Sequence, residues 1–202
     1  AYKIGDKDRY DFHIIVAKEV FDASPGTEGF EEWRRKAKGV NFGFIYGIGN
    51  KRQAKTLGVT VEEVAEYRER YFERIPGSRQ FIKQAAQRVE TRVYVYNKYG
   101  RRYYIDFHRA YITPNYLVQG SCADFVKLRM VDIAKLLEGY DAHLLIQVHD
   151  ELVMEIREGQ EKELLPRIKN ALQADDFGIP LPVSISRCNG SWINKEKLEI
   201  AA

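Results

Sequence analysis

Hydrophobic positions recur every three or four residues through most of the first hundred residues, which is the spacing of amphipathic helices. This pattern predicts helices over about residues 9–21, 28–44 and 61–75, and a fourth that follows Pro76-Gly77 and runs to about residue 92. The Ser-Pro-Gly-Thr sequence at 24–27 forms a turn cluster ahead of the second helix. Thr60 and Glu63 have the spacing of a capping box, which marks the start of the third.

From about residue 93 onward, strand-like runs of hydrophobic residues appear and predict strands among the helices. The expected strands cover residues 93–95, 102–105, 143–148, 152–156 and about 181–187. One helix is expected from about residue 111 or 115 to 138, with Pro114 at its start or at a kink, and another at about 160–173. A hydrophobic stripe predicts the core face of the longer helix: Val118, Cys122, Val126, Met130, Ile133 and Leu137. The whole pattern is α+β, with a soft boundary near residues 107–110.

Composition and charge narrow the class of protein. The 202 residues are 45% hydrophobic and 30% charged, as in a globular protein of one or two domains, and no apolar run approaches the roughly 20 residues of a membrane helix. Cys122 and Cys188 are too few for a disulfide framework, so we expect both to be reduced and structural, in the cytoplasm or an organelle and not in a secreted protein. Residues 1–100 have a net charge of +5 and residues 101–202 of −2. The first half therefore favours an anionic partner, although a solvated surface explains the same charges.

The second predicted helix has a pattern of charges and rings that suits a nucleoside triphosphate. Four residues spaced four apart share one side of it: Arg34, Lys38, Phe42 and Tyr46. Two cations at one end suit phosphate groups, and aromatic rings at the other end suit stacking on a base. Gly43, beside Phe42, leaves room for a second flat group. The alternative is a surface helix whose aromatic residues reach the core.

A second candidate site is the tip of the hairpin predicted over residues 143–156. His149, Asp150 and Glu151 lie there, between two apolar strands. Burying both strands would hold Asp150 rigidly at an edge reached by solvent, and such a carboxylate suits a hard Mg²⁺ ion. Magnesium ions align the substrate of a phosphoryl transfer and neutralise its charge. The alternative is a polar hairpin turn without a function of its own.

Both segments resemble motifs of family A DNA polymerases, the bacterial polymerase I type. R-x3-K-x3-F-G-x2-Y-G at residues 34–47 is similar to the nucleotide-binding helix of that family, and Q-V-H-D-E-L-V at 147–153 to its second carboxylate motif. Further similarities are D-x-H at 11–13, G-R-R at 100–102 and N-x3-Q-G-x2-A-D at 115–124. The resemblance covers nearly the whole chain. It implies an incomplete right-hand fold of the α+β class, with helical fingers over 1–108, beginning with a short palm connection, and the C-terminal part of the palm, with an antiparallel β-sheet, over 109–202.

The resemblance also implies a role for each matching residue. The dNTP-binding residues would be His13, Arg34, Lys38, Phe42 and Tyr46. The DNA-binding residues would be Gly43, Asn115, Gln119 and His149. Asp150, Lys38 and Glu151 would be catalytic, and Asp150 would be a ligand of the two Mg²⁺ ions. Asn115 and Gln119 are one helical turn apart, and their amide donors suit the minor-groove acceptors that every base pair presents.

The activity that the resemblance implies is DNA-directed DNA synthesis, in which a nucleotide passes from a dNTP to a primer 3′-hydroxyl. The earlier D-Y-S-type motif, which supplies the other metal-binding carboxylate of the family, does not occur in the sequence. We expect it upstream of Ala1, so this chain would be a fragment that is inactive alone. Its partners would be primer–template DNA, dNTPs and the rest of the polymerase, with its thumb and any exonuclease domain.

One alternative function remains open. The chain could be a non-catalytic nucleotide- and DNA-binding subunit, or a remnant, of a split polymerase. A phage-type RNA polymerase is disfavoured, because Asn41-Phe42-Gly43 and His149-Asp150-Glu151 resemble the DNA-polymerising branch. Among the departures from the family pattern, Tyr111 occupies the place of an Arg that is usual there, and Gly120-Ser121-Cys122-Ala123-Asp124 replaces G-T-A-A-D.

Overall fold

The computed structural model describes residues 11–173, 176–178 and 181–200, and the chain divides into two compact units. The first unit reaches Ser121 and the second begins at Cys122, so helix α7 (Thr113–Leu136) contributes to both. The α+β class is confirmed. The predicted division into fingers and palm at residues 108 and 109 does not coincide with this boundary and stays a prediction. Within the described ranges, no helix is both long and apolar enough to cross a membrane.

Five helices form most of the first unit: α2 (Phe12–Phe21), α3 (Phe30–Ile45), α4 (Asn50–Leu57), α5 (Val61–Arg74) and α6 (Pro76–Arg92). All but α4 were predicted, although the first two residues of the helix expected at 9–21 lie outside the described residues. The capping box of α5 is confirmed, because Thr60 Oγ1 accepts a hydrogen bond from the Glu63 N–H at 3.1 Å and Glu63 Oε2 accepts one from the Thr60 N–H at 2.7 Å.

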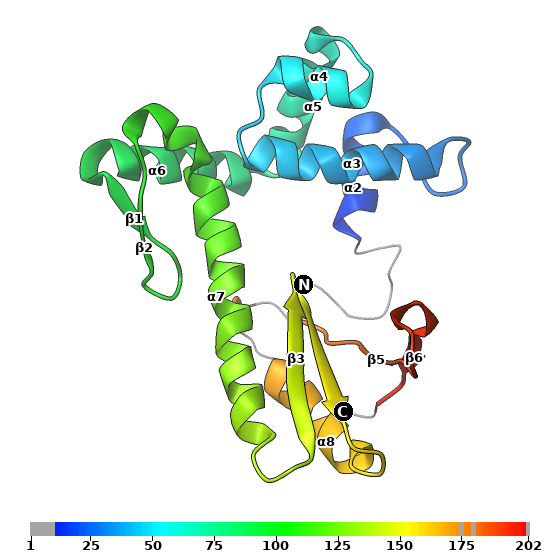
Figure 1. Cartoon of the computed structure of the whole chain (residues 1–202). Helices are drawn as coiled ribbons and strands as arrows, with labels where there is room; N and C mark the ends of the chain where they lie inside the picture. The colour runs from blue at the N-terminus through cyan, green and yellow to red at the C-terminus, as the bar shows by residue number, and fades with distance from the viewer. Residues whose placement is uncertain (1–10, 174–175, 179–180, 201–202) are drawn as a thin grey trace. The chain divides into compact units, whose positions relative to one another are not determined.

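The core of the first four helices fixes the inner side of α3. Helix α2 crosses α3 (Figure 1), and Val16, Val40 and Phe44 are almost completely buried between these helices and α5. The Tyr71 ring packs edge-on against Phe44, with 5.4 Å between the ring centroids. Burial raises the pKa of Tyr71 to about 12. Because one side of α3 is packed in this way, its other side is left for ligands.

A second, smaller core lies where the chain turns from α6 into α7. Strands β1 (Tyr94–Tyr96) and β2 (Arg102–Tyr104) form the predicted hairpin, and a 3₁₀ helix η1 (Phe107–Ile112) leads into α7. Val89, Val95 and Leu117 are buried here and join α6, β1 and α7. Pro114 is the second residue of α7, in the first turn where a missing N–H costs little, as expected.

The second unit consists of short antiparallel pairs around the end of α7. Its elements are β3 (Ala142–Val148), β4 (Glu151–Ile156), α8 (Glu161–Leu172), β5 (Ile185–Arg187), η2 (Trp192–Asn194) and β6 (Glu196–Leu198). Strand β3 pairs with β4 and β5 with β6. The β3–β4 pairing ends at Val148 and Glu151, which leaves His149 and Asp150 as the two-residue loop at the tip.

Two expectations about burial in this region are wrong. Of the predicted stripe on α7, only Ile133 and Leu137 are buried, and Cys122 is exposed. The hairpin is not buried on both strands either, since 52% of Leu145 and 53% of Ile146 is exposed. The core of the second unit contains residues of β4 and Ala142 at the start of β3. Among the described residues, nothing covers the later part of β3, from Leu145 to Val148. Alternation of apolar residues predicted β3 and β4 correctly but could not say what would cover them, and β6 was not predicted.

Candidate functional site

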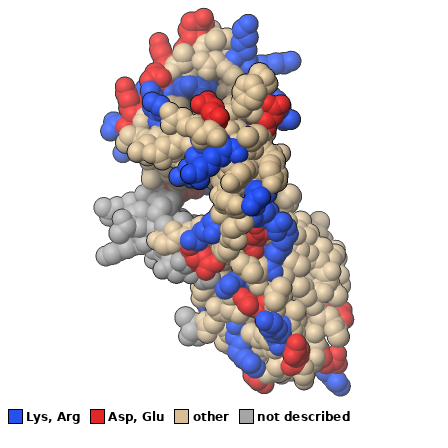
Figure 2. All heavy atoms as spheres, turned by 90° about the vertical axis from the view of Figure 1, so that its left-hand side faces the viewer, with Lys and Arg blue, Asp and Glu red and all other residues tan. Residues whose placement is uncertain are grey.

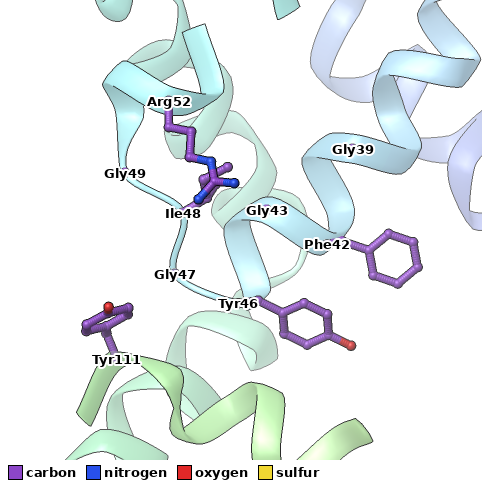
Figure 3. Close-up of a pocket in the computed structure, with 9 residues that line it drawn as sticks. All are labelled: Gly39, Phe42, Gly43, Tyr46, Gly47, Ile48, Gly49, Arg52 and Tyr111. Atoms are coloured by element: carbon purple, nitrogen blue, oxygen red, sulfur yellow. The ribbon is translucent and has the colours of Figure 1, made fainter. Parts of the chain in front are cut away.

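The outer side of α3 carries the predicted nucleotide-binding residues. Arg34, Lys38 and Phe42 lie on it, opposite the buried side of the helix, and 54% of Phe42 is exposed. Tyr46 follows directly after the last helical residue, and its ring stacks against Phe42 with 5.9 Å between centroids. In Figure 3 both rings project from the same side of α3. The four-residue spacing therefore predicted the arrangement of this face correctly.

Helix α2 brings two further polar residues to the face. Nδ1 of His13 lies 2.8 Å from Nδ2 of the buried Asn41, and the His13 ring centroid is 6.4 Å from that of Phe42. Asp11, which caps α2, accepts a hydrogen bond from the Arg34 guanidinium at 2.5 Å. His13 was predicted here, whereas no sequence signal had singled out the Asp11–Arg34 pair.

The charges on this face influence one another. Partial burial raises the pKa of Asp11. This effect is outweighed by the hydrogen bond and the charge of Arg34 and by hydrogen bonds from two backbone N–H groups, so that the pKa is lowered overall. Burial lowers the pKa of His13; the charge of Asp11 opposes this effect, and the charges of Lys38 and Arg34 add to it. The two predicted phosphate ligands, Arg34 and Lys38, therefore lie within electrostatic range of His13.

Beside these rings, a hollow of about 640 Å³ opens at the C-terminal end of α3. It is lined by Gly39, Phe42, Gly43, Tyr46, Gly47, Ile48, Gly49, Arg52 and Tyr111 (Figure 3). Arg52 comes from the unpredicted helix α4 and Tyr111 from η1, so sequence spacing did not link them to the site. Gln119 Nε2 of α7 donates to the Tyr46 hydroxyl at 3.2 Å, which joins a predicted DNA-binding residue to a predicted dNTP-binding one.

Gly43 has a packing role that the sequence did not indicate. A Cβ atom on Gly43 would lie 2.4 Å from Oε1 of the buried Gln53 and 2.7 Å from Cγ2 of Ile48. Arg68 also holds this loop, since its guanidinium donates to the Ile48 carbonyl at 2.6 Å. The lack of a side chain at Gly43 thus lets α3 pack closely on the segment that leads into α4, and a contact with DNA at this position stays a prediction.

The acidic hairpin tip belongs to the second unit and is exposed. His149 has a φ of +53°, and the Gln147 side chain donates to its carbonyl oxygen, which supports this turn. Asp150 is exposed beside it. The Glu151 carboxylate instead pairs with Lys195, with 2.7 Å between Nζ and Oε1. Nothing in the sequence linked Lys195 to this motif.

The carboxylate of Asp150 fits one part of a magnesium site. An exposed carboxylate on a short loop is a ligand that Mg²⁺ prefers, and such ions take the rest of their ligands from water and phosphates. Over the ranges that the structure describes, three or more His, Cys, Asp or Glu side chains do not come together. Asp150 is thus the residue suited to the metal, and a complete site needs ligands beyond the hairpin. Lys38 and Asp150 lie in different units, so their joint catalytic role stays a prediction.

Comparison with known proteins identifies the family. The model of DNA polymerase family A matches residues 4–194, almost the whole chain. The chain belongs to DNA polymerase family A. This confirms the family that the motifs of α3 and of the β3–β4 hairpin predicted.

The family A relatives are bacterial and much longer. The chain is 34% identical over 186 residues to the thermostable DNA polymerase I of Thermus filiformis, covering 87% of this chain and 22% of the relative. It is 31% identical over 186 residues to DNA polymerase I of Helicobacter pylori strain 26695, covering 87% of this chain and 20% of that relative. The chain thus spans about a fifth of the length of these relatives.

A solved structure supports the same fold. It is the POL domain of Pol1 from M. smegmatis in complex with DNA primer-template and dNTP, with a TM-score of 0.77 and 29% identity. The similarity covers 85% of this chain and 32% of that one. The match confirms that the described elements form part of a polymerase domain.

Proposed function

We propose that this chain is the fingers and the later palm of a DNA-directed DNA polymerase. The reaction is attack of a primer 3′-hydroxyl on the α-phosphate of a dNTP, with release of pyrophosphate. The observation that carries the proposal is the convergence on one face of α3 of two cations, a partly buried histidine and two stacked rings. This set matches the phosphates, sugar and base of a nucleotide laid along the helix.

Arg34 and Lys38 hold the triphosphate, and Lys38 protonates the pyrophosphate as it leaves. Phe42 packs on the incoming sugar and base, and Tyr46 borders the position of the templating base. Rotation of α3 closes the site around a correct pair. Arg34 is hydrogen-bonded to Asp11 in the structure. When the nucleotide binds, Arg34 therefore either keeps this bond while it also contacts a phosphate oxygen, or gives the bond up for one.

His13 assists as a hydrogen-bond donor. Nδ2 of Asn41 is a donor, so Nδ1 of His13 accepts and the ring proton resides on Nε2. The lowered pKa of His13 favours this neutral form. Nε2 is then free to donate to a phosphate oxygen, while Asn41 fixes the orientation of the ring.

At the hairpin, Asp150 would hold Mg²⁺ together with a carboxylate from the earlier motif, which we place outside these 202 residues. When bound, Mg²⁺ ions neutralise charge on the triphosphate and align it for in-line attack. Glu151 acts beside Asp150 and is held in place by Lys195. His149 contacts the primer end. Asn115 and Gln119, one turn apart on α7, contact the minor groove of the primer–template.

The nucleotide site can be tested without catalysis, by measuring dNTP affinity of the whole chain. Lys38→Ala should weaken binding about tenfold or more, because a hydrogen bond to a charged group contributes about 1.5–3 kcal/mol. Lys36→Ala is the matched control: it removes the same charge from the same helix, but Lys36 pairs with Glu32 at 2.9 Å and lies over the Trp33 ring. Equal losses in the two variants would contradict the placement of Lys38.

Primer extension distinguishes the polymerase from a non-catalytic binding subunit. We expect no extension by residues 1–202 alone and extension when the segment with the earlier carboxylate motif is supplied. In that active form Asp150→Ala should abolish synthesis, while Glu158→Gln, in the turn after β4, should not. An active Asp150→Ala enzyme would contradict the metal assignment, and persistent inactivity would favour the binding subunit. We expect a cytoplasmic or organellar location for this polymerase.

A further inference from the structure

The β1–β2 hairpin presents an outer face of three tyrosines and one arginine. Strand residues alternate between the two faces of a hairpin, and Tyr94 pairs with Tyr104 and Tyr96 with Arg102. These four side chains therefore share one face, called the tyrosine face here. None of them has a part in the nucleotide site or the acidic hairpin.

The opposite face of the hairpin is packed, so the tyrosine face cannot turn inward. Val95 is buried, and the ring of Tyr103 lies 5.4 Å from that of Tyr116 on α7. A Cβ atom on Gly120 would lie 2.1 Å from the Tyr103 hydroxyl, which shows how closely this residue approaches α7. The hairpin is anchored through Val95 and Tyr103.

The side chains of the tyrosine face form one connected and exposed surface. The Tyr94 ring is 5.5 Å from that of Tyr96 and 6.0 Å from that of Tyr104, and 46% of Tyr96 and 70% of Tyr104 is exposed. The Arg102 guanidinium lies 4.9 Å from the Tyr94 centroid and donates to the hydroxyls of Tyr96 and Tyr104 at 2.7 and 3.0 Å. These contacts hold the rings in place and reduce the entropy lost when a flat group stacks on them.

The charge around this surface favours an anionic partner. From Arg92 to Ile105 the sequence has four basic residues and no acidic one: Arg92, Lys98, Arg101 and Arg102. Figure 2 views the side on which α6 and the hairpin lie in Figure 1, and Lys and Arg side chains lie there among uncharged and acidic ones. The hydrogen bonds that Arg102 donates to the Tyr104 and Tyr96 hydroxyls raise its pKa further, and an arginine is charged in any case.

We propose that the tyrosine face is a binding site for single-stranded DNA. Unpaired bases stack on the Tyr96 and Tyr104 rings, and the surrounding cations bind the phosphates. Aromatic rings within a basic surface are the means by which proteins bind single strands without reading sequence. A duplex hides its base faces and would use only the cations, so the exposed rings favour the single strand.

The test measures anisotropy of a labelled oligothymidylate of about ten nucleotides with the whole chain, in parallel with a duplex of the same length. Replacing both Tyr96 and Tyr104 by Leu keeps apolar volume and removes the rings. We expect single-strand affinity to fall at least about fivefold for each stacked base and duplex affinity to change less than about twofold. Unchanged single-strand binding, or an equal loss on both DNAs, would overturn the proposal.

A matched control is Tyr140→Leu. Tyr140 also accepts a hydrogen bond from an arginine, Arg167, whose guanidinium lies 5.6 Å from its ring, but it is in the second unit. Its replacement should leave single-strand binding unchanged. If the double variant does not fold, photo-crosslinking of a bromodeoxyuridine oligonucleotide to the unaltered chain decides the matter. Crosslinks within residues 94–104 support the proposal, and crosslinks only elsewhere contradict it.

Discussion

Nδ2 of Asn41 lies 2.8 Å from Nδ1 of His13, so the side chain of a buried residue on α3 sets the orientation of a histidine on α2. Asn41 Oδ1 is also buried, with no hydrogen-bond partner among the described residues. Leaving a buried polar atom unpaired costs about 1–3 kcal/mol, so we expect this contact to have a use. The use that we infer is to hold the His13 ring with Nε2 toward the nucleotide.

The titration of His13 is the first prediction. Its pKa should lie below 6.5, because burial and two cations disfavour the charged ring. Lys38→Met should raise the pKa by removing a like charge, and Asp11→Asn should lower it further by removing the opposite one. The measurement is a ¹H–¹⁵N NMR titration of the imidazole. Shifts in the same direction in both variants would contradict the arrangement.

The same shift makes stability depend on pH. Because folding lowers the pKa of His13, the unfolded chain binds more protons than the folded one between the folded pKa and 6.5. The free energy of unfolding contributed by His13 is therefore constant above this window and falls as pH decreases through it. Urea denaturation at several pH values should show a smaller decrease in His13→Gln than in the unaltered chain.

Gly43→Ala should destabilise the first unit by about 1–3 kcal/mol, the usual cost of overpacking a core. The added methyl group would collide with Gln53 and Ile48. Gly39→Ala, one turn earlier in α3, is the control, since a Cβ there would meet nothing within 4 Å. This change should instead stabilise the helix by about 0.5–1 kcal/mol. Denaturant unfolding of both variants measures the difference, and a loss of stability in both would contradict the packing argument.

Val93 is a strained residue whose replacement should stabilise the chain. It has a φ of +63° at the end of α6, and 60% of it is exposed, so no packing compensates for the conformation. Val93→Asn should add about 1 kcal/mol, because Asn tolerates the left-handed region and β-branched residues do not. Val131→Asn, at a half-exposed position inside α7, should bring no gain. Equal effects of the two changes on the thermal midpoint would contradict the predicted strain.

Local patterns predicted the elements with strong periodicity or caps, and missed those that depend on contacts. Helices α3 and α5 followed from their spacing and from the Thr60–Glu63 box. Helix α4 was missed because it is only eight residues long and mostly polar. The hydrogen bonds from Arg68 to Ile48, in the loop before α4, and to Asn50, its first residue, join residues about twenty positions apart, which no periodicity encodes.

The same limit applies to the two candidate sites: local spacing predicted residues on one helix, and contacts between distant segments were missed. The order of Lys38 and Phe42 on α3, with Tyr46 directly after its last residue, could be deduced from a single sequence. The engagement of Glu151 by Lys195, 44 residues away in sequence, could not, because the contact depends on how the C-terminal segment folds back on the hairpin.

Phe42→Tyr tests the position of the ring against the incoming sugar. A hydroxyl added at an exposed ring beside the nucleotide could replace the hydrogen bond that a terminator without a 3′-hydroxyl lacks. We expect terminator incorporation relative to the normal dNTP to rise about tenfold, as one well-placed hydrogen bond allows. The measurement is the incorporation ratio in an active polymerase that contains this chain. Phe81→Tyr on α6, which is also partly exposed, is the control and should leave the ratio unchanged. An unchanged ratio in Phe42→Tyr would place the sugar elsewhere on α3.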